Sequence, residues 1–183
     1  KVSVGRVRLY LLDTDLEENA QQDRDLSARL YGGDRETRLQ QEIILGIGGV
    51  RALRALEIAP AVWHLNEGHA AFVVLQRIHE FTAEGMGFDE ALTAVRNTTI
   101  FTTHTPVAAG HDAFPFDRVE HHLQGAWAPL ADDRSRFLAL GGRRVGPGAE
   151  RTARGGDGLV DGVGGGDRNL GDRLAGGGVE HVQ

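Results

Sequence analysis

The stretch AVWHLNEGH, residues 61–69, contains the first of two segments that decide the predicted fold. Ala61 to Leu65 is apolar and follows Pro60, so we predict a buried strand with polar residues directly after it. The second segment, TIFTTHT at residues 99–105, has the same form, a β-branched strand over Thr99–Thr103 that runs into polar residues. Apolar strands separated by helical sequence indicate a parallel sheet covered by helices.

The helical sequence begins near Arg35. From there apolar residues recur every three or four positions and predict one buried stripe, formed by Leu39, Ile43, Ile44, Ile47, Val50, Leu53 and Leu56. A second helix is predicted from about Gly68 to Phe81, with Asn66 as its N-cap. A third is predicted over Asp89–Arg96.

The chain before this helix is mostly polar. Val7 to Leu12 is apolar and partly alternating, so we expect a strand that joins the same sheet. Asp13 to Asp34 is polar and contains Gly32 and Gly33, which predicts a loop with a short helical turn. Residues 1–140 are therefore predicted to form one α/β domain in which strands and helices alternate.

The composition of the 183 residues excludes several classes of protein. There is no Cys, which excludes a disulfide framework, a thiolate zinc site and a cysteine nucleophile. The net charge of -6 argues against a nucleic-acid partner, because such partners select clustered Lys and Arg. No apolar run approaches the roughly 18 residues that a membrane span needs. The sequence thus predicts a globular domain with neither a nucleic acid nor a membrane as partner.

Residues 141–183 differ from the rest in composition. They hold 15 of the 26 glycines and no aromatic residue, so this stretch cannot bury enough apolar surface to offset its chain entropy. We expect it to be a disordered, low-complexity tail. Two origins remain open: a natural flexible extension, or a shifted reading frame after Leu140 in a GC-rich gene, whose codons would yield Gly, Arg, Ala, Asp and Val.

Polar residues follow both predicted strands of the sheet. Asn66 to His69 come after the first, and His104 and Thr105, with His111 and Asp112, come after the second. Parallel strands bring their carboxyl ends to one edge, which is where open α/β sheets bind ligands. A carboxylate and an imidazole at such an edge suit a hydroxyl-rich ligand. The alternative for Glu67 is a purely local role, favouring the dipole of the next helix.

Other chemistries are weakly supported. The glycines of Gly46–Gly49 do not form the dinucleotide fingerprint, because they lie inside the helical stripe, so close helix packing is the better interpretation. The eight histidines show no HExxH pair, and no metal-ligand set can be defended; His121 and His122 are expected on a solvated helix face. The lack of a GxSxG elbow argues against a serine hydrolase.

Three longer segments carry a family resemblance. In order along the chain they are RLYGGDRETRLQQEIILGIGGVRAL at 29–53, VWHLNEGHAAF at 62–72 and FTTHTPVAAGHDAFP at 101–115. Together they resemble the short-form bacterial and archaeal α-glucan phosphorylases, over Val7 to about Leu140. In the longer glycogen and maltodextrin phosphorylases, the motifs RLKQE, LNDTH and TNHT are similar to residues 38–42, 65–69 and 103–105.

The resemblance implies an internal piece of an enzyme with the GT-B fold, residues 1–140 being part of its Rossmann-like N-terminal domain. Such enzymes are cytoplasmic glycosyltransferases that release glucose 1-phosphate from the ends of α-1,4-glucan or maltodextrin with inorganic phosphate. They use pyridoxal phosphate, held by a lysine of the C-terminal domain that has no counterpart here, and the full-length enzyme is a possible homo-oligomer. The isolated chain is expected to be inactive.

The resemblance also implies a substrate site and no catalytic residue in this chain. Glu67 and His69 match the acidic residue and the histidine lining the glucosyl subsite, and His104 matches a second histidine that contacts the terminal sugar. Asp34 matches a mobile loop that gates the cleft. Two alternatives stay open: a non-catalytic carbohydrate-binding module, and another GT-B glycosyltransferase such as a glycogen synthase.

Overall fold

The computed structural model describes residues 1–29, 33–104, 112–123, 135–136, 140 and 152–154. Its helical elements are α1 (Gln21–Arg24), η1 (Asp25–Ser27), α2 (Arg35–Ile43), η2 (Ile44–Gly48), α3 (Gly49–Ala55), η3 (Gly68–Ala70), α4 (Phe72–Ala83), α5 (Phe88–Asn97) and α6 (Phe116–Leu123). Its strands are β1 (Val2–Val4), β2 (Val7–Leu9), β3 (Trp63–Asn66), β4 (Thr99–Thr102), β5 (Ala113–Pro115) and β6 (Thr152–Arg154). Within these ranges, no helix is long and apolar enough to cross a membrane.

The parallel pair β3–β4 confirms the central prediction. Trp63 lies beside Thr99 and Leu65 beside Phe101, and all four side chains are buried on one face. Residues of the other face, such as His64 and Ile100, are exposed. The alternation follows from the two-residue period of a strand, and among the described residues the buried face of this pair is the one that joins the core.

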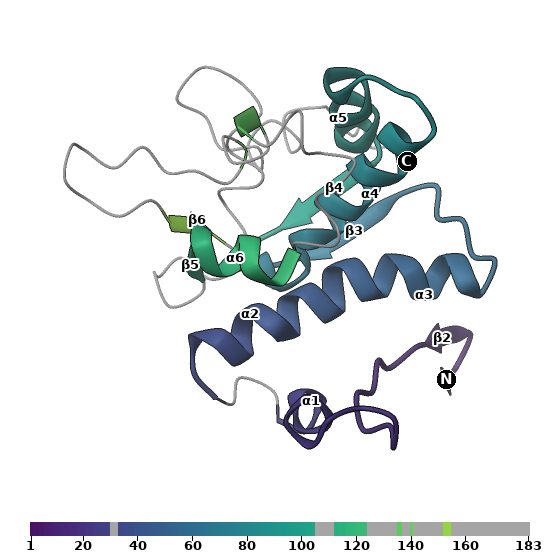
Figure 1. Cartoon of the computed structure of the whole chain (residues 1–183). Coiled ribbons are helices and arrows are strands. Elements are labelled where there is room, and N and C mark those ends of the chain that lie inside the picture. Colours follow the sequence, from purple (N-terminus) through teal and green to yellow (C-terminus); the bar gives the residue numbers. More distant parts are fainter. Residues whose placement is uncertain (30–32, 105–111, 124–134, 137–139, 141–151, 155–183) are drawn as a thin grey trace.

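The helical stripe forms one continuous rod, in which the π-helical η2 joins α2 to α3. Figure 1 shows this rod passing between α1 on one side and β3–β4 on the other. Leu39, Ile47 and Val50 are buried in the core, as the spacing predicts. Leu56 is a correction to the predicted stripe: it lies beyond the end of α3 and is 48% exposed.

The close approach of α4 to this rod requires glycine at position 46. A methyl group at its Cα would lie 2.6 Å from Cβ of Phe72 and 2.9 Å from the backbone of that residue, so α4 approaches the rod too closely for any side chain. This confirms the close-packing interpretation for Gly46. Nothing lies within 4 Å of the same position at Gly49, so that glycine is not required for packing.

Gly46→Ala is expected to lower the free energy of unfolding by about 1–3 kcal/mol, because an overpacked core must displace the Phe72 backbone. Gly49→Ala is the matched control, and it is expected to be neutral or to stabilise the protein by up to about 1 kcal/mol through helix propensity. Urea denaturation of the two variants measures both effects. Equal stabilities would show that the contact with Phe72 is not limiting.

The strand predicted over Val7–Leu12 has a different partner from the one expected. β2 pairs with β1 in an antiparallel hairpin, and within the described ranges neither strand is hydrogen-bonded to β3 or β4. The reason is local: Gly5 adopts a φ of +60°, which closes a tight turn and brings β1 alongside β2. The loop prediction for Asp13–Asp34 is supported, since it contains the short helices α1 and η1.

The segment after β3 differs from the predicted helix start. Asn66 is the last residue of the strand and not an N-cap, and a 3₁₀ turn at η3 precedes the helix proper, which begins at Phe72. Buried apolar residues then fill the first two turns of α4, including Phe72, Leu75 and Ile78. The polar residues 66–69 are thus held in a short connection at the end of the sheet, where they are available to a site.

Helix α6 packs near the start of α2. Glu36 accepts hydrogen bonds from Arg118 at 3.0 Å and from His122, and the His122 bond lowers the pKa of Glu36. His121 is exposed as predicted, but His122 is a half-buried partner of Glu36, which corrects the prediction of a solvated pair. Of residues 141–183, the structure describes Thr152–Arg154, which pair with β5; the remainder of the predicted tail lies outside the described residues.

Candidate functional site

The carboxyl ends of β3 and β4 meet in a group of polar contacts. Glu67 Oε2 accepts a hydrogen bond from the Thr103 hydroxyl at 3.1 Å, and Glu67 Oε1 accepts one from the backbone N–H of His104. The imidazole Nε2 of His104 lies 2.9 Å from Asn66 Oδ1. The sequence prediction that these two strand ends share one edge is therefore confirmed.

Glu67 has an unusual backbone for its residue type. Its φ is +59° and its ψ is -176°, a region that side chains with a Cβ rarely adopt, and its side chain is only 7% exposed. Such strain costs of order 1–3 kcal/mol and persists where surrounding contacts hold it. Here the hydrogen bonds to Thr103 and His104 are those contacts.

A second group of polar side chains lies around Arg38. Its Nη2 lies 2.8 Å from Asp112 Oδ2, 3.1 Å from His69 Nδ1 and 3.4 Å from Glu42 Oε1. The four residues come from α2, η3 and the segment before β5. A guanidinium group can only donate, so His69 Nδ1 accepts and the ring carries its proton on Nε2.

The charge state of this group follows from burial. Burial raises the pKa of Glu42 to about 9, and the neighbouring Asp112 adds to the rise while Arg38 opposes it. Burial, and next the positive charge of Arg38, lowers the pKa of His69. At neutral pH we therefore expect an uncharged Glu42 and an uncharged His69 around an Arg38–Asp112 ion pair.

The same group contains the ligand types of a metal site. Glu42, His69 and Asp112 each offer a ligand atom within 4.8 Å of the others. Arg38, however, lies within hydrogen-bonding distance of all three, so a metal ion would have to displace a cation already in place. This cluster is organised around the guanidinium group of Arg38.

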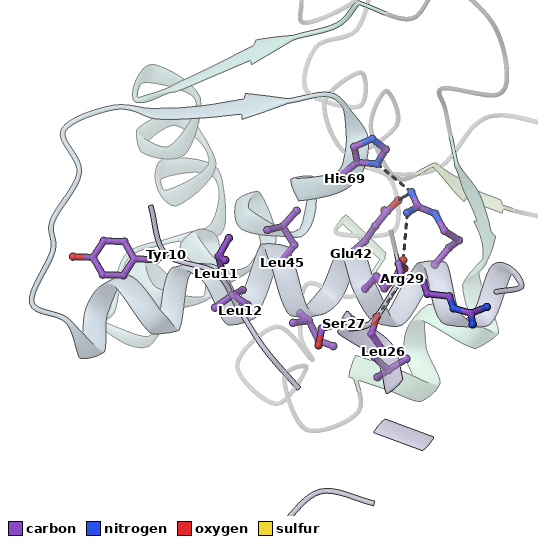
Figure 2. Close-up of a pocket in the computed structure, with 12 residues that line it drawn as sticks. Tyr10, Leu11, Leu12, Leu26, Ser27, Arg29, Glu42, Leu45 and His69 are labelled. Atoms are coloured by element: carbon purple, nitrogen blue, oxygen red, sulfur yellow. Dashed lines mark hydrogen bonds and ion pairs between the residues drawn. The ribbon is translucent and has the colours of Figure 1, made fainter. Parts of the chain in front are cut away.

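A cavity of about 340 Å³ opens beside the cluster. Figure 2 shows His69 and Glu42 at one end of it and Tyr10, Leu11 and Leu12 toward the other. Leu26, Ile44 and Leu45 complete a mainly apolar lining. Ser27, Arg29, Arg38 and Gln41 also line the cavity, and Tyr10 carries a hydroxyl at the opposite end, so its hydrogen-bonding groups are not confined to the end that holds His69.

The structure places the four sequence-predicted site residues in three locations. Glu67 and His104 are in contact, and His69, two residues after Glu67, contacts Arg38. Asp34 is instead the N-cap of α2, accepting from the backbone N–H of Thr37 at 2.9 Å. That hydrogen bond lowers the pKa of Asp34. Tyr31, Gly32, Thr105 and His111, from the predicted loop and polar clusters, lie outside the described residues.

Sequence reasoning misses two parts of this site. Arg38 and Glu42 stand four residues apart, the spacing that puts both on one helix face, and Glu42 falls within the buried stripe. A charged pair at that position is a signal of a buried polar group, because acidic residues are seldom buried without a partner. The second missed part is the contact between Asn66 and His104, because Asn66 is predicted to cap a helix and not to contact another side chain.

The chain is similar to one segment of several known proteins. Maltodextrin phosphorylase of Thermococcus litoralis is 56% identical over 141 residues, 77% of this chain and 17% of that protein. Glycogen phosphorylase of Mycobacterium tuberculosis (strain ATCC 25618 / H37Rv) is 50% identical, over 74% of this chain and 16% of that protein. Glycogen phosphorylase of Aquifex aeolicus is 38% identical, over 77% and 20%. No family model matches.

The chain spans less than a quarter of the length of these curated relatives, and each match covers about three quarters of the chain. The segment is mixed helix and strand with a parallel pair, which is compatible with the α/β class. The chain is thus a fragment that belongs to the family of the maltodextrin and glycogen phosphorylases.

Proposed function

We propose that this chain is part of the glucan-binding half of an α-glucan phosphorylase with the GT-B fold. The observation that supports it most is the contact between Glu67 and His104 at the carboxyl edge of β3–β4, where the family resemblance expects a glucosyl subsite. His69 lies two residues after Glu67, against Arg38. The names of the relatives favour a phosphorylase over a glycogen synthase. The substrate would be a maltodextrin, with inorganic phosphate as the second substrate of the whole enzyme.

The residues of this chain do not fit the cofactor of the family. Pyridoxal phosphate is held as a Schiff base and requires a lysine beside the substrate. The sequence has one lysine, Lys1, which is exposed beside the hairpin of β1 and β2. No step of the reaction is therefore assigned to the cofactor here. The residues of this chain would bind and orient the sugar.

The isolated chain is expected to show no phosphorolysis. Incubation of the 183-residue protein with maltodextrin and phosphate should yield no glucose 1-phosphate, with or without added pyridoxal phosphate, because stabilisation of the reacting phosphate needs basic groups of another domain. Measurable turnover by the purified chain would contradict this assignment. A chain that binds maltodextrin without turning it over would also fit the second candidate, a carbohydrate-binding module.

His104→Ala is expected to weaken binding of maltoheptaose by about tenfold, since a lost hydrogen bond to a ligand hydroxyl costs on the order of 1–2 kcal/mol. The measurement is a titration followed by the imidazole resonance of His69, which wild type and both variants retain, in the nuclear magnetic resonance spectrum of the full chain. His121→Ala is the control, because His121 is exposed on α6 and should leave the affinity unchanged. Equal losses in both variants would place the sugar elsewhere.

A further inference from the structure

At the carboxyl ends of β3 and β4, a side-chain oxygen takes the place of a backbone carbonyl as acceptor in the hydrogen-bond ladder. This bond joins the residues after β3 to those after β4. The backbone N–H of Glu67 donates to the Thr102 carbonyl at 2.8 Å, which continues the parallel ladder by one residue. In a regular parallel pair the carbonyl of the same residue would accept the N–H of His104. Here the Glu67 carboxylate accepts that N–H, because the positive φ of Glu67 ends the extended backbone.

The imidazole of His104 is held by Asn66, the residue before Glu67 at the end of β3. Asn66 Oδ1 lies 2.9 Å from His104 Nε2, and an amide oxygen can only accept, so the ring proton is on Nε2. Asn66 and Glu67 therefore fix His104 at two points, the ring and the backbone. The Thr103 hydroxyl, bound to the other carboxylate oxygen, fixes the residue before it.

We propose that Glu67 and Asn66 are positioning residues that orient His104, and that Glu67 does not act through its charge on the ligand. This inference rests on the proposed glucan site for its consequence, but its geometry does not depend on the ligand. The carboxylate is nine-tenths buried and both of its oxygens receive hydrogen bonds from the segment it holds. Each carboxylate oxygen keeps a second lone pair, so it is the burial of Glu67, 7% exposed, that limits the access of a ligand hydroxyl to it.

Replacing Glu67 by glutamine separates two roles of its side chain, the positioning of His104 by hydrogen bonds and the action of its charge on a ligand. Its amide oxygen can accept the His104 N–H, and its amide nitrogen can donate to the Thr103 hydroxyl, which rotates to accept. Glu67→Gln therefore keeps the contacts and removes the charge, whereas Glu67→Ala removes both. For Asn66, Asp keeps the acceptor for His104 Nε2 and Ala removes it.

The test is hydrogen exchange and nuclear magnetic resonance on the full 183-residue chain. In Glu67→Gln the His104 amide should exchange within about threefold of the wild-type rate, and in Glu67→Ala at least about tenfold faster, as expected for loss of a charge-assisted bond. The His104 Nε2 proton should be observed in wild type and Asn66→Asp and lost to solvent exchange in Asn66→Ala. Protection of Leu65 and Phe101 reports whether each variant remains folded.

Titration with maltoheptaose gives the second readout. Unchanged affinity in Glu67→Gln, with weakened binding in Glu67→Ala, would support the positioning role. Loss of affinity in Glu67→Gln with His104 still protected would overturn it, because the charge would then act on the ligand. Fast exchange of His104 in Glu67→Gln would also overturn it. If wild type fails to bind maltoheptaose but the exchange pattern holds, the glucan site fails and the positioning of His104 stands.

Discussion

Arg38→Met is expected to lower the free energy of unfolding by about 1–3 kcal/mol, less than the roughly 3–5 kcal/mol for breaking a fully buried ion pair, because the Asp112 side chain is 33% exposed. Arg38 contacts Asp112, His69 and Glu42, and its side chain is 13% exposed. Methionine retains the apolar stem but leaves the Asp112 carboxylate without its cation. Chemical denaturation at neutral pH measures the loss.

Arg54→Met is the matched control for this prediction. Arg54 lies on α3 of the same helical rod and pairs with Glu80 at 2.9 Å, but its side chain is 45% exposed. Exposed ion pairs contribute about 1 kcal/mol or less, so the control should change little. A comparable loss in both variants would show that the Arg38 cluster contributes no more than a surface pair. The imidazole resonances of His69 should shift in Arg38→Met alone, because His69 loses its donor.

The elements that sequence reasoning predicts well are those in which local pattern and burial agree. The alternation of Trp63 and Leu65 with His64 and Asn66 determines both the strand and its buried face, and the result needs no information from distant residues. The apolar spacing along α2 to α3 works in the same way. The β1–β2 hairpin escapes such reasoning, because a choice between two strand partners depends on a single turn at Gly5.

The sequence predicts where the site lies better than it predicts how the side chains in it are arranged. Parallel strand ends must meet, so the sequence alone is enough to bring Glu67 and His104 together. The direction of each side chain depends on one backbone angle, the positive φ of Glu67, which no pattern of residue types specifies for a non-glycine residue. The cap prediction for Asn66 is wrong for a related reason: a strand end and a helix cap favour the same residue types at that position.

Glu42 provides the prediction with the clearest dependence on pH. Its pKa is about 9 in the folded protein, against 4.5 for the exposed group, and its side chain is 2% exposed. Between these two values the folded state holds a proton that the unfolded state has released. The contribution of this bound proton to the free energy of unfolding is fully present below pH 4.5 and is lost as the pH rises toward 9. The free energy of unfolding falls over this range by at most about 1.4 kcal/mol per pH unit.

Glu42→Gln should remove this slope, since glutamine is nearly isosteric and never ionises. Its amide can still donate to Asp112 and accept from Arg38, the groups that face Glu42 together with His69. We therefore expect the variant and the wild type to be similar near pH 4.5, and the variant to become progressively more stable toward pH 9. Urea denaturation across this range measures the difference, in which the titrations of Glu36 and Asp34 cancel because both proteins share them.

The sign of that difference decides what Glu42 is. A gain for Glu42→Gln that grows with pH means that the wild-type carboxyl is buried in its neutral form and acts as a hydrogen-bond donor toward Asp112. A loss that grows with pH means that Glu42 is an anion held by Arg38, and that its pKa lies below the value of the exposed group. Since Arg38 also contacts His69, the two outcomes give the proposed glucan site different net charges at neutral pH.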